Sequence, residues 1–189
     1  SVSIAALGAE LSSIRDSVGR ELLWQAGPAW ARHAPVLFPI VGRVLDDRFT
    51  VGGREFTMTQ HGFARDLPFE AERVGESSVV FSLSDSETTR RMFPFSFLFQ
   101  LTYTLSGDTL EVRHRLVNTG ETTLHASVGA HPGFAWPLPG AESRELHTIE
   151  FEHEESAPIR RLDGGRLLPD AFSTPVVGRT LEVRDSLFV

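Results

Sequence analysis

Three segments of the sequence combine histidine, arginine, glycine and aromatic residues in ways that could support chemistry on a polar small molecule. Residues 34–43 form an apolar stretch with two prolines that ends in an arginine. Residues 60–66 read Gln-His-Gly-Phe-Ala-Arg-Asp, and residues 129–136 read Gly-Ala-His-Pro-Gly-Phe-Ala-Trp. Imidazole groups transfer protons near neutral pH, and aromatic faces beside polar groups suit sugars, whose C–H bonds stack on rings.

Each segment also has a purely structural interpretation. Proline fits poorly in a central strand, so the first segment is expected to be an edge or an irregular crossing that delivers Arg43 to a rim, where it could simply be solvated. His61 could be a loop histidine bonded to backbone, with Arg65 in an ordinary surface pair. The aromatic residues after His131 could pack around a turn at the edge of the core. From the residues alone, both interpretations stay open.

Other catalytic patterns are weak in this sequence. The histidines lack the close spacing of a metal site, so no metal site is predicted. The sequence contains no G-x-S-x-G elbow, no glycine-rich phosphate loop and no G-x-G-x-x-G fingerprint. The acidic cluster around Glu150 alternates with Phe151, which is typical of a solvated edge strand.

Composition bounds the class of protein. The chain has 189 residues, no cysteine and a formal net charge of −7, and its 41% hydrophobic content predicts a single packed domain over residues 1–189. The absence of cysteine excludes a disulfide framework and favours a reducing compartment, so we expect a cytoplasmic location. The negative charge argues against nucleic acid as a partner. No apolar stretch reaches the roughly 18 residues that a membrane helix needs, so no membrane association is expected.

Alternation of apolar and polar residues is the strongest periodicity in the chain, and turn signals recur between the alternating runs. No segment sustains a helical period. This pattern predicts an all-β, antiparallel sandwich or barrel. The predicted strands and hairpins cover residues 48–58, 79–83, 95–105, 110–116 and 124–130. One short helical turn is predicted over residues 86–92.

Taken together, the motifs LFPIVGR, QHGFAR and HPGF resemble the aldose 1-epimerase family, also called galactose mutarotases, and especially its bacterial LacX-like branch. The resemblance extends from GAELSSIRD near the start to GRTLEVRDSLF near the end, so it covers nearly the whole chain. It implies a large antiparallel β-sandwich, the galactose mutarotase-like supersandwich, with a sugar cleft on one face. It also implies interconversion of the α and β anomers of a free aldohexose, with a small-molecule sugar as the partner.

The resemblance assigns roles to individual residues. His131 corresponds to the family histidine that acts as the acid at the ring oxygen, and His61 to the histidine that stabilises charge at, or orients, the same oxygen. Arg43 lines up with the family arginine that holds sugar hydroxyls. Arg65 is added as a second substrate-binding residue because it lies near His61 in the sequence, without a family match. The implied reaction needs no metal and no organic cofactor.

One catalytic group has no counterpart in the sequence. The family base is a glutamate in a C-terminal segment, and no glutamate present here matches its motif, so we expect the chain to lack its C-terminal strands. Two alternatives follow: a non-catalytic carbohydrate-binding protein of the same fold, and a hexose-6-phosphate 1-epimerase whose cationic pocket would draw on the many arginines. The identity of the sugar and the oligomeric state stay open.

Overall fold

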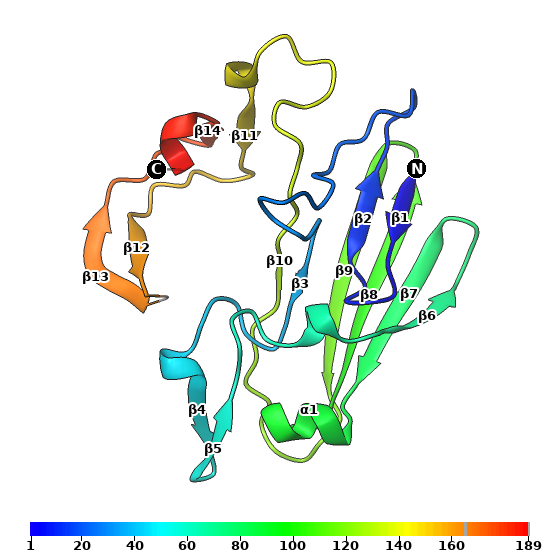
Figure 1. Ribbon diagram of the computed structural model, residues 1–189, viewed down its shortest axis with the longest axis vertical. Coiled ribbons are helices and arrows are strands. Elements are labelled where there is room, and N and C mark those ends of the chain that lie inside the picture. The colour runs from blue at the N-terminus through cyan, green and yellow to red at the C-terminus, as the bar shows by residue number, and fades with distance from the viewer. Residues whose placement is uncertain (165, 189) are drawn as a thin grey trace. The chain divides into compact units, whose positions relative to one another are not determined.

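The computed structural model describes residues 1–164 and 166–188, and its contacts divide the chain into two compact units, residues 1–133 and residues 134–189. The regular structure is dominated by strands in antiparallel pairs, which confirms the predicted all-β class (Figure 1). Within these described residues, four short 3-10 helices lie at Leu45–Asp47, Ala64–Asp66, Arg144–Leu146 and Asp185–Phe188. The strands and the α-helix are β1 (Val2–Ile4), β2 (Leu11–Ile14), β3 (Val36–Leu37), β4 (Arg48–Val51), β5 (Arg54–Thr57), β6 (Glu70–Arg73), β7 (Ser78–Ser84), α1 (Glu87–Met92), β8 (Phe97–Ser106), β9 (Thr109–Asn118), β10 (Gly129–Ala130), β11 (Thr148–Glu150), β12 (Ile159–Asp163), β13 (Arg166–Phe172) and β14 (Thr180–Glu182).

A four-stranded antiparallel sheet in the order β6-β7-β8-β9 is the largest element of the first unit (Figure 1). The predicted hairpin of β8 and β9 is confirmed, with an unbroken register from Phe97 opposite Asn118 to Ser106 opposite Thr109. Gly107 begins the two-residue turn at φ +59°, a conformation that glycine adopts without steric cost. The buried face of β8 carries its alternate residues Phe97, Phe99, Leu101 and Tyr103.

This sheet face packs against Phe38, the residue that follows β3. Phe38 is fully buried; its ring centroid lies 4.6 Å from that of Phe99 and 5.0 Å from that of Phe97. Phe63 joins the cluster edge-on, 6.0 Å from Phe38. Burying each such side chain stabilises the fold by about 1.5–3 kcal/mol, so the segments on either side of Phe38 and Phe63 are held against the core.

Two smaller elements complete this core. The predicted tight hairpin is confirmed as β4 and β5, and the predicted helical turn is confirmed as α1. Ser86 caps α1 reciprocally: its hydroxyl accepts from the Thr89 amide at 3.2 Å, and its own amide donates to the Thr89 hydroxyl at 2.8 Å. Such a capping box satisfies two of the amides that the first turn of a helix leaves unpaired.

The strand predicted over residues 124–130 is largely wrong. Only Gly129–Ala130 forms a strand, β10, which pairs with β3, while Ala126 and Val128 are exposed. Alternation indicates a strand only where a neighbouring strand pairs with it. Among the described residues, 124–128 have no such partner strand, although Leu124 packs against the core and the Ser127 amide donates to the Pro39 carbonyl at 2.9 Å. The short β3–β10 pair is nevertheless the contact that brings two of the three candidate segments together.

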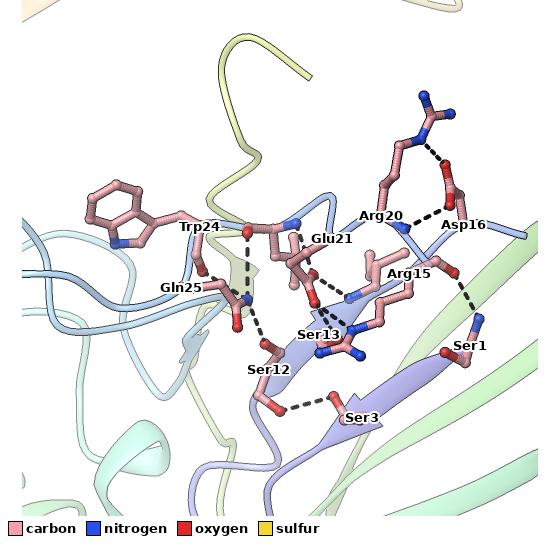
Figure 2. Close-up of polar contacts among 12 residues, drawn as sticks. Ser1, Ser3, Ser12, Ser13, Arg15, Asp16, Arg20, Glu21, Trp24 and Gln25 are labelled. Carbon is pink, nitrogen blue, oxygen red and sulfur yellow. Dashed lines mark hydrogen bonds and ion pairs between the residues drawn. The ribbon is translucent and has the colours of Figure 1, made fainter. Parts of the chain in front are cut away.

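Glu21 ties the β1–β2 hairpin to the loop that follows it (Figure 2). One of its carboxylate oxygens accepts from the amides of Ile14 at 2.9 Å and Leu23 at 3.1 Å, while the other accepts from the Ser13 hydroxyl and from Arg15. Burial raises the pKa of Glu21, and these hydrogen bonds outweigh it, lowering the pKa to about 2. The side chain is only 19% exposed, so this is an internal brace of the first unit.

In the second unit, β11 pairs with β14 and β12 pairs with β13. Glu150 lies on the exposed β11 and forms an ion pair with Arg179, as expected for a solvated strand. Trp136 packs inside this unit: its indole N–H donates to the Arg144 carbonyl at 2.7 Å, and the Arg144 guanidinium lies 3.8 Å from the ring centroid. Phe188 lies 5.5 Å from the same tryptophan.

Candidate active site

The structure brings His61 and His131 side by side, although they are 70 positions apart in the sequence. Their ring centroids are 6.1 Å apart with the planes inclined by 38°. His61 is partly buried and His131 is exposed at the surface of the first unit. An imidazole pair at this distance can contact one small molecule from two sides.

Short segments around β3 explain why the two histidines meet. The β3–β10 pair places Ala130 opposite Val36, and His131 follows at once, its amide donating to the Pro35 carbonyl at 3.2 Å. On the other side, the Phe38 carbonyl accepts from the amides of Phe63 at 3.0 Å and Ala64 at 3.2 Å. One segment, residues 35–38, therefore holds both histidine loops.

Gly62 makes this approach feasible. A Cβ at this position would lie 2.2 Å from the Phe38 carbonyl oxygen, and the backbone has φ +73°. Both features require glycine, because a side chain would collide with backbone and also favours negative φ. The glycine of the HGF motif is thus a packing requirement that places His61 beside β3.

His61 itself is held by the backbone of Gly42. The His61 amide donates to the Gly42 carbonyl at 2.8 Å, and the Gly42 amide donates to Nδ1 of His61 at 3.0 Å. Burial lowers the pKa of His61, and the positive charge of Arg65 and the neighbouring His131 lower it further. The ring is therefore predominantly neutral at neutral pH.

An aromatic residue not predicted from the sequence, Trp30, contacts the second histidine. Its ring lies edge-on to His131 with centroids 5.4 Å apart. Trp24 braces this loop, because its indole N–H donates to the Trp30 carbonyl at 2.7 Å and its amide donates to the Gly133 carbonyl at 2.8 Å. A Cβ on Gly133 would lie 2.6 Å from the Trp30 ring, which explains the glycine of the HPGF motif.

Arg65 lies close enough to His61 to lower its pKa, and its side chain is only 19% exposed. One terminal nitrogen donates to the Gln60 carbonyl at 2.6 Å, while the buried Nε has no hydrogen-bond partner among the described residues. Burial and the nearby Arg32 lower the pKa of Arg65, whereas Asp66 raises it. Asp66 pairs with both arginines, at 2.6 Å from Arg32 and 3.7 Å from Arg65.

Arg43 is committed to a neighbour. Its guanidinium donates two hydrogen bonds to Asp47, each at 2.6 Å, and its side chain is half exposed. The hydrogen bonds that Arg43 donates to Asp47, and the negative charge of that carboxylate, raise the pKa of Arg43. To hold a sugar hydroxyl, the Arg43 guanidinium would have to do so while it is hydrogen-bonded to the Asp47 carboxylate.

The other aromatic residues of the third segment lie in the second unit. Phe134 is 58% exposed, and Trp136 is occupied by Arg144 and Phe188. Sequence reasoning therefore grouped residues that belong to different units and missed Trp30 and Gly42. The sequence offered one signal for Trp30: the chain has three tryptophans, and two of them, Trp24 and Trp30, shortly precede the first candidate segment.

In the described part of the chain, no group of three or more histidine, cysteine, aspartate or glutamate side chains is arranged to hold a metal ion. Within residues 1–164 and 166–188, no helix is long and apolar enough to cross a membrane.

Known proteins resemble this chain over the region that holds all three motifs. The family model for aldose 1-epimerase matches residues 1–168. Protein LacX of Lactococcus lactis subsp. lactis, in its plasmid form, is 36% identical over 165 residues, which is 84% of this chain and 55% of that protein. The chain thus spans about half the length of the curated relatives it matches.

Solved structures agree with this assignment of fold. A galactose mutarotase related enzyme from Lactobacillus acidophilus superimposes with a TM-score of 0.88 at 36% identity, covering 99% of this chain and 63% of that one. A galactose mutarotase-like protein from Lactobacillus casei gives a TM-score of 0.83 at 30% identity, covering 96% and 64%. The antiparallel fold of this chain is therefore galactose mutarotase-like, as the sequence motifs predicted.

Proposed function

Because the chain belongs to the aldose 1-epimerase family, we propose that the protein containing it interconverts the α and β anomers of a free aldohexose. The observation that carries this proposal is the pair of imidazole rings, His61 and His131, held 6.1 Å apart by the segments around β3. The two imidazole rings differ in exposure and surroundings, and both could contact the same oxygen of a sugar. Such a pair suits a reaction that transfers protons without redox chemistry.

The proposed reaction opens and recloses a hemiacetal. A base removes the proton from the hydroxyl on C1 while the bond between C1 and the ring oxygen breaks, and an acid delivers a proton to that oxygen. The resulting aldehyde rotates about the bond between C1 and C2. Ring closure on the opposite face reverses both proton transfers, so atoms, protons and charge balance.

Roles for the residues follow from their settings. His131, exposed and beside Trp30, is proposed as the acid at the ring oxygen. His61, which is partly buried and mostly neutral, is proposed to hydrogen-bond the same oxygen. Arg65 contributes positive charge close to His61, which favours the negative charge that develops on oxygen. No base is assigned within the chain; we propose that it lies in a C-terminal segment of the intact protein, as the family resemblance implies.

The ion pairs favour an uncharged sugar over a phosphorylated one. Asp47 occupies the fork of Arg43, and Asp66 pairs with Arg32 and Arg65. A phosphate group would have to displace these carboxylates to gain a guanidinium. Comparing anomer exchange of glucose with that of glucose 6-phosphate tests this preference, and a clear preference for the phosphorylated sugar would overturn it.

The assignment of His131 is tested by NMR exchange spectroscopy or polarimetry with the intact protein and a panel of free aldoses. His131→Ala should slow anomer exchange by about 10²–10⁴-fold, the range typical of an acid–base group. His125→Ala is the matched control: His125 is an exposed histidine of the same unit, and its loss should change the rate by about twofold at most. Unchanged exchange in His131→Ala would remove the proposed acid. Sugar binding without any acceleration by the wild type would favour the non-catalytic alternative.

A further inference from the structure

The two hydrogen bonds between Gly42 and His61 form a closed clamp. The Gly42 carbonyl accepts from the His61 amide at 2.8 Å, and the Gly42 amide donates to Nδ1 of the His61 ring at 3.0 Å. The backbone of one residue, Gly42, therefore fixes both the backbone and the ring of His61. The second of these bonds carries information about where the ring proton is.

An amide N–H can donate only to a nitrogen that has a free lone pair. Nδ1 of His61 is therefore unprotonated, and a neutral imidazole with an unprotonated Nδ1 carries its hydrogen on Nε2. Protonating the ring would place a second N–H against the Gly42 amide and break the clamp. We infer that Gly42 is a positioning residue that holds His61 as the neutral Nε2–H tautomer, so that the ring offers a substrate oxygen a hydrogen-bond donor.

The charged groups around His61 act in the same direction. Arg65 and His131 are the titratable groups that influence it, both disfavour a further positive charge, and burial adds to their effect. Asp66 is paired with Arg32 and Arg65, so its negative charge is shared with two guanidinium groups. Clamp and surroundings both keep the ring neutral.

The backbone conformation explains why position 42 holds glycine. Gly42 has φ +84°, and a Cβ there would meet no atom within 4 Å. Space is available, so the requirement is conformational: L residues with side chains rarely adopt this φ. His61 also has positive φ, +66°, which is uncommon for histidine and is held in place by the same clamp.

This inference rests on the proposed function only for its consequence. In anomer exchange, the Nε2–H of His61 would bind the ring oxygen without giving up its proton, while His131 supplies the proton. The two histidines would then have different roles: His61 binds the ring oxygen as a fixed donor, and His131 transfers the proton. The tautomer itself can be measured whether or not the protein turns over a sugar.

The direct test is nitrogen-15 NMR of the His61 ring in the intact protein, free of sugar. We expect an unprotonated Nδ1 and a protonated Nε2 at neutral pH. On acidification, the amide resonance of Gly42 should shift with the same midpoint as the His61 ring, because protonation breaks their bond. An Nδ1–H tautomer, a mixture of the two, or a Gly42 amide that ignores the titration of His61 would overturn the inference.

Two substitutions separate clamp from donor. His61→Asn places an oxygen near the Nδ1 position, so the Gly42 amide should stay protected from hydrogen exchange while anomer exchange falls as far as in His61→Ala. His61→Gln places an N–H near the Nε2 position, so part of the turnover should survive with a less protected Gly42 amide. The reverse pattern, with Asn active and Gln inactive, would contradict the donor role. If no aldose is turned over, the proposed function fails while the NMR result still decides the tautomer.

Discussion

Position 62 has the strictest steric requirement for glycine among the glycines of this site. A Cβ there would lie 2.2 Å from the Phe38 carbonyl oxygen, and this oxygen accepts the hydrogen bonds that fix the following two residues. Gly62→Ala should therefore cost about 1–2 kcal/mol for its positive φ and a further 1–3 kcal/mol for displacing the backbone. Urea unfolding of the intact protein measures this change in the free energy of unfolding.

Gly53 provides the matched control for that change. It has nearly the same φ, +77°, but a Cβ there would meet nothing within 4 Å. Gly53→Ala should cost only the conformational part, about 1–2 kcal/mol. Equal losses for the two variants would mean that the contact with Phe38 relaxes freely and does not hold the His61 loop.

At this level the sequence allowed the candidate histidines to be predicted but not their setting. His61 and His131 were identified by their motifs, and the structure places their rings together. Gly42, by contrast, depends on a left-handed backbone and a tertiary hydrogen bond, neither of which leaves a periodic signal in the sequence. Trp30 could not be assigned because an isolated aromatic residue reads equally well as packing.

Among the elements, the β1–β2 hairpin depends on the charge of Glu21. Its pKa is lowered to about 2 from an ordinary value of 4.5, so the folded state holds the ionised form more strongly than the unfolded chain does. The resulting stabilisation is present above about pH 4.5 and is lost as the pH falls toward 2. Glu21→Gln should cost about 1.5–3 kcal/mol at neutral pH, the range for hydrogen bonds to a charged group.

The pH dependence is the sharper readout of this prediction. The free energy of unfolding of Glu21→Gln should decline less between pH 5 and pH 3 than that of the wild type, because one carboxylate with a lowered pKa has been removed. Glu87→Gln on the exposed helix α1 is the control and should leave the slope unchanged, since exposed ion pairs contribute little. Parallel curves for Glu21→Gln and the wild type would show that the brace does not depend on its charge.

Strands were predicted correctly where one of their faces packs against a buried layer. The β8–β9 hairpin was predicted because one face of β8 lies against the phenylalanine core, which imposes strict alternation. Residues 124–128 alternate equally well but form no strand. The strands β12 and β13 were not predicted, because β12 and residues 167–172 of β13 have no buried side chain to impose a pattern. Alternation is therefore informative only where a second layer exists.

For the whole molecule, the two units differ in what they can contribute to the proposed reaction. The first contains both histidines, Arg65 and Trp30, and the second contains seven glutamates, among them those at positions 142, 145 and 150. The matched region covers 55% of the length of LacX. The resemblance assigned the base to none of these glutamates, so we propose that the base of the reaction lies outside residues 1–189.

This expectation can be tested in the intact protein by replacing Glu142, Glu145 and Glu150 together with glutamine. Glu150 already pairs with Arg179 on an exposed strand, and all three side chains are exposed, so the charges are solvated and their loss should leave the fold intact. We expect anomer exchange within about twofold of the wild-type rate, the scale of ordinary surface substitutions. Because an acid–base group contributes about 10²–10⁴-fold, a loss of that size would place the base inside this chain and leave the C-terminal assignment without support. Far-ultraviolet circular dichroism of the triple variant distinguishes such a loss from unfolding.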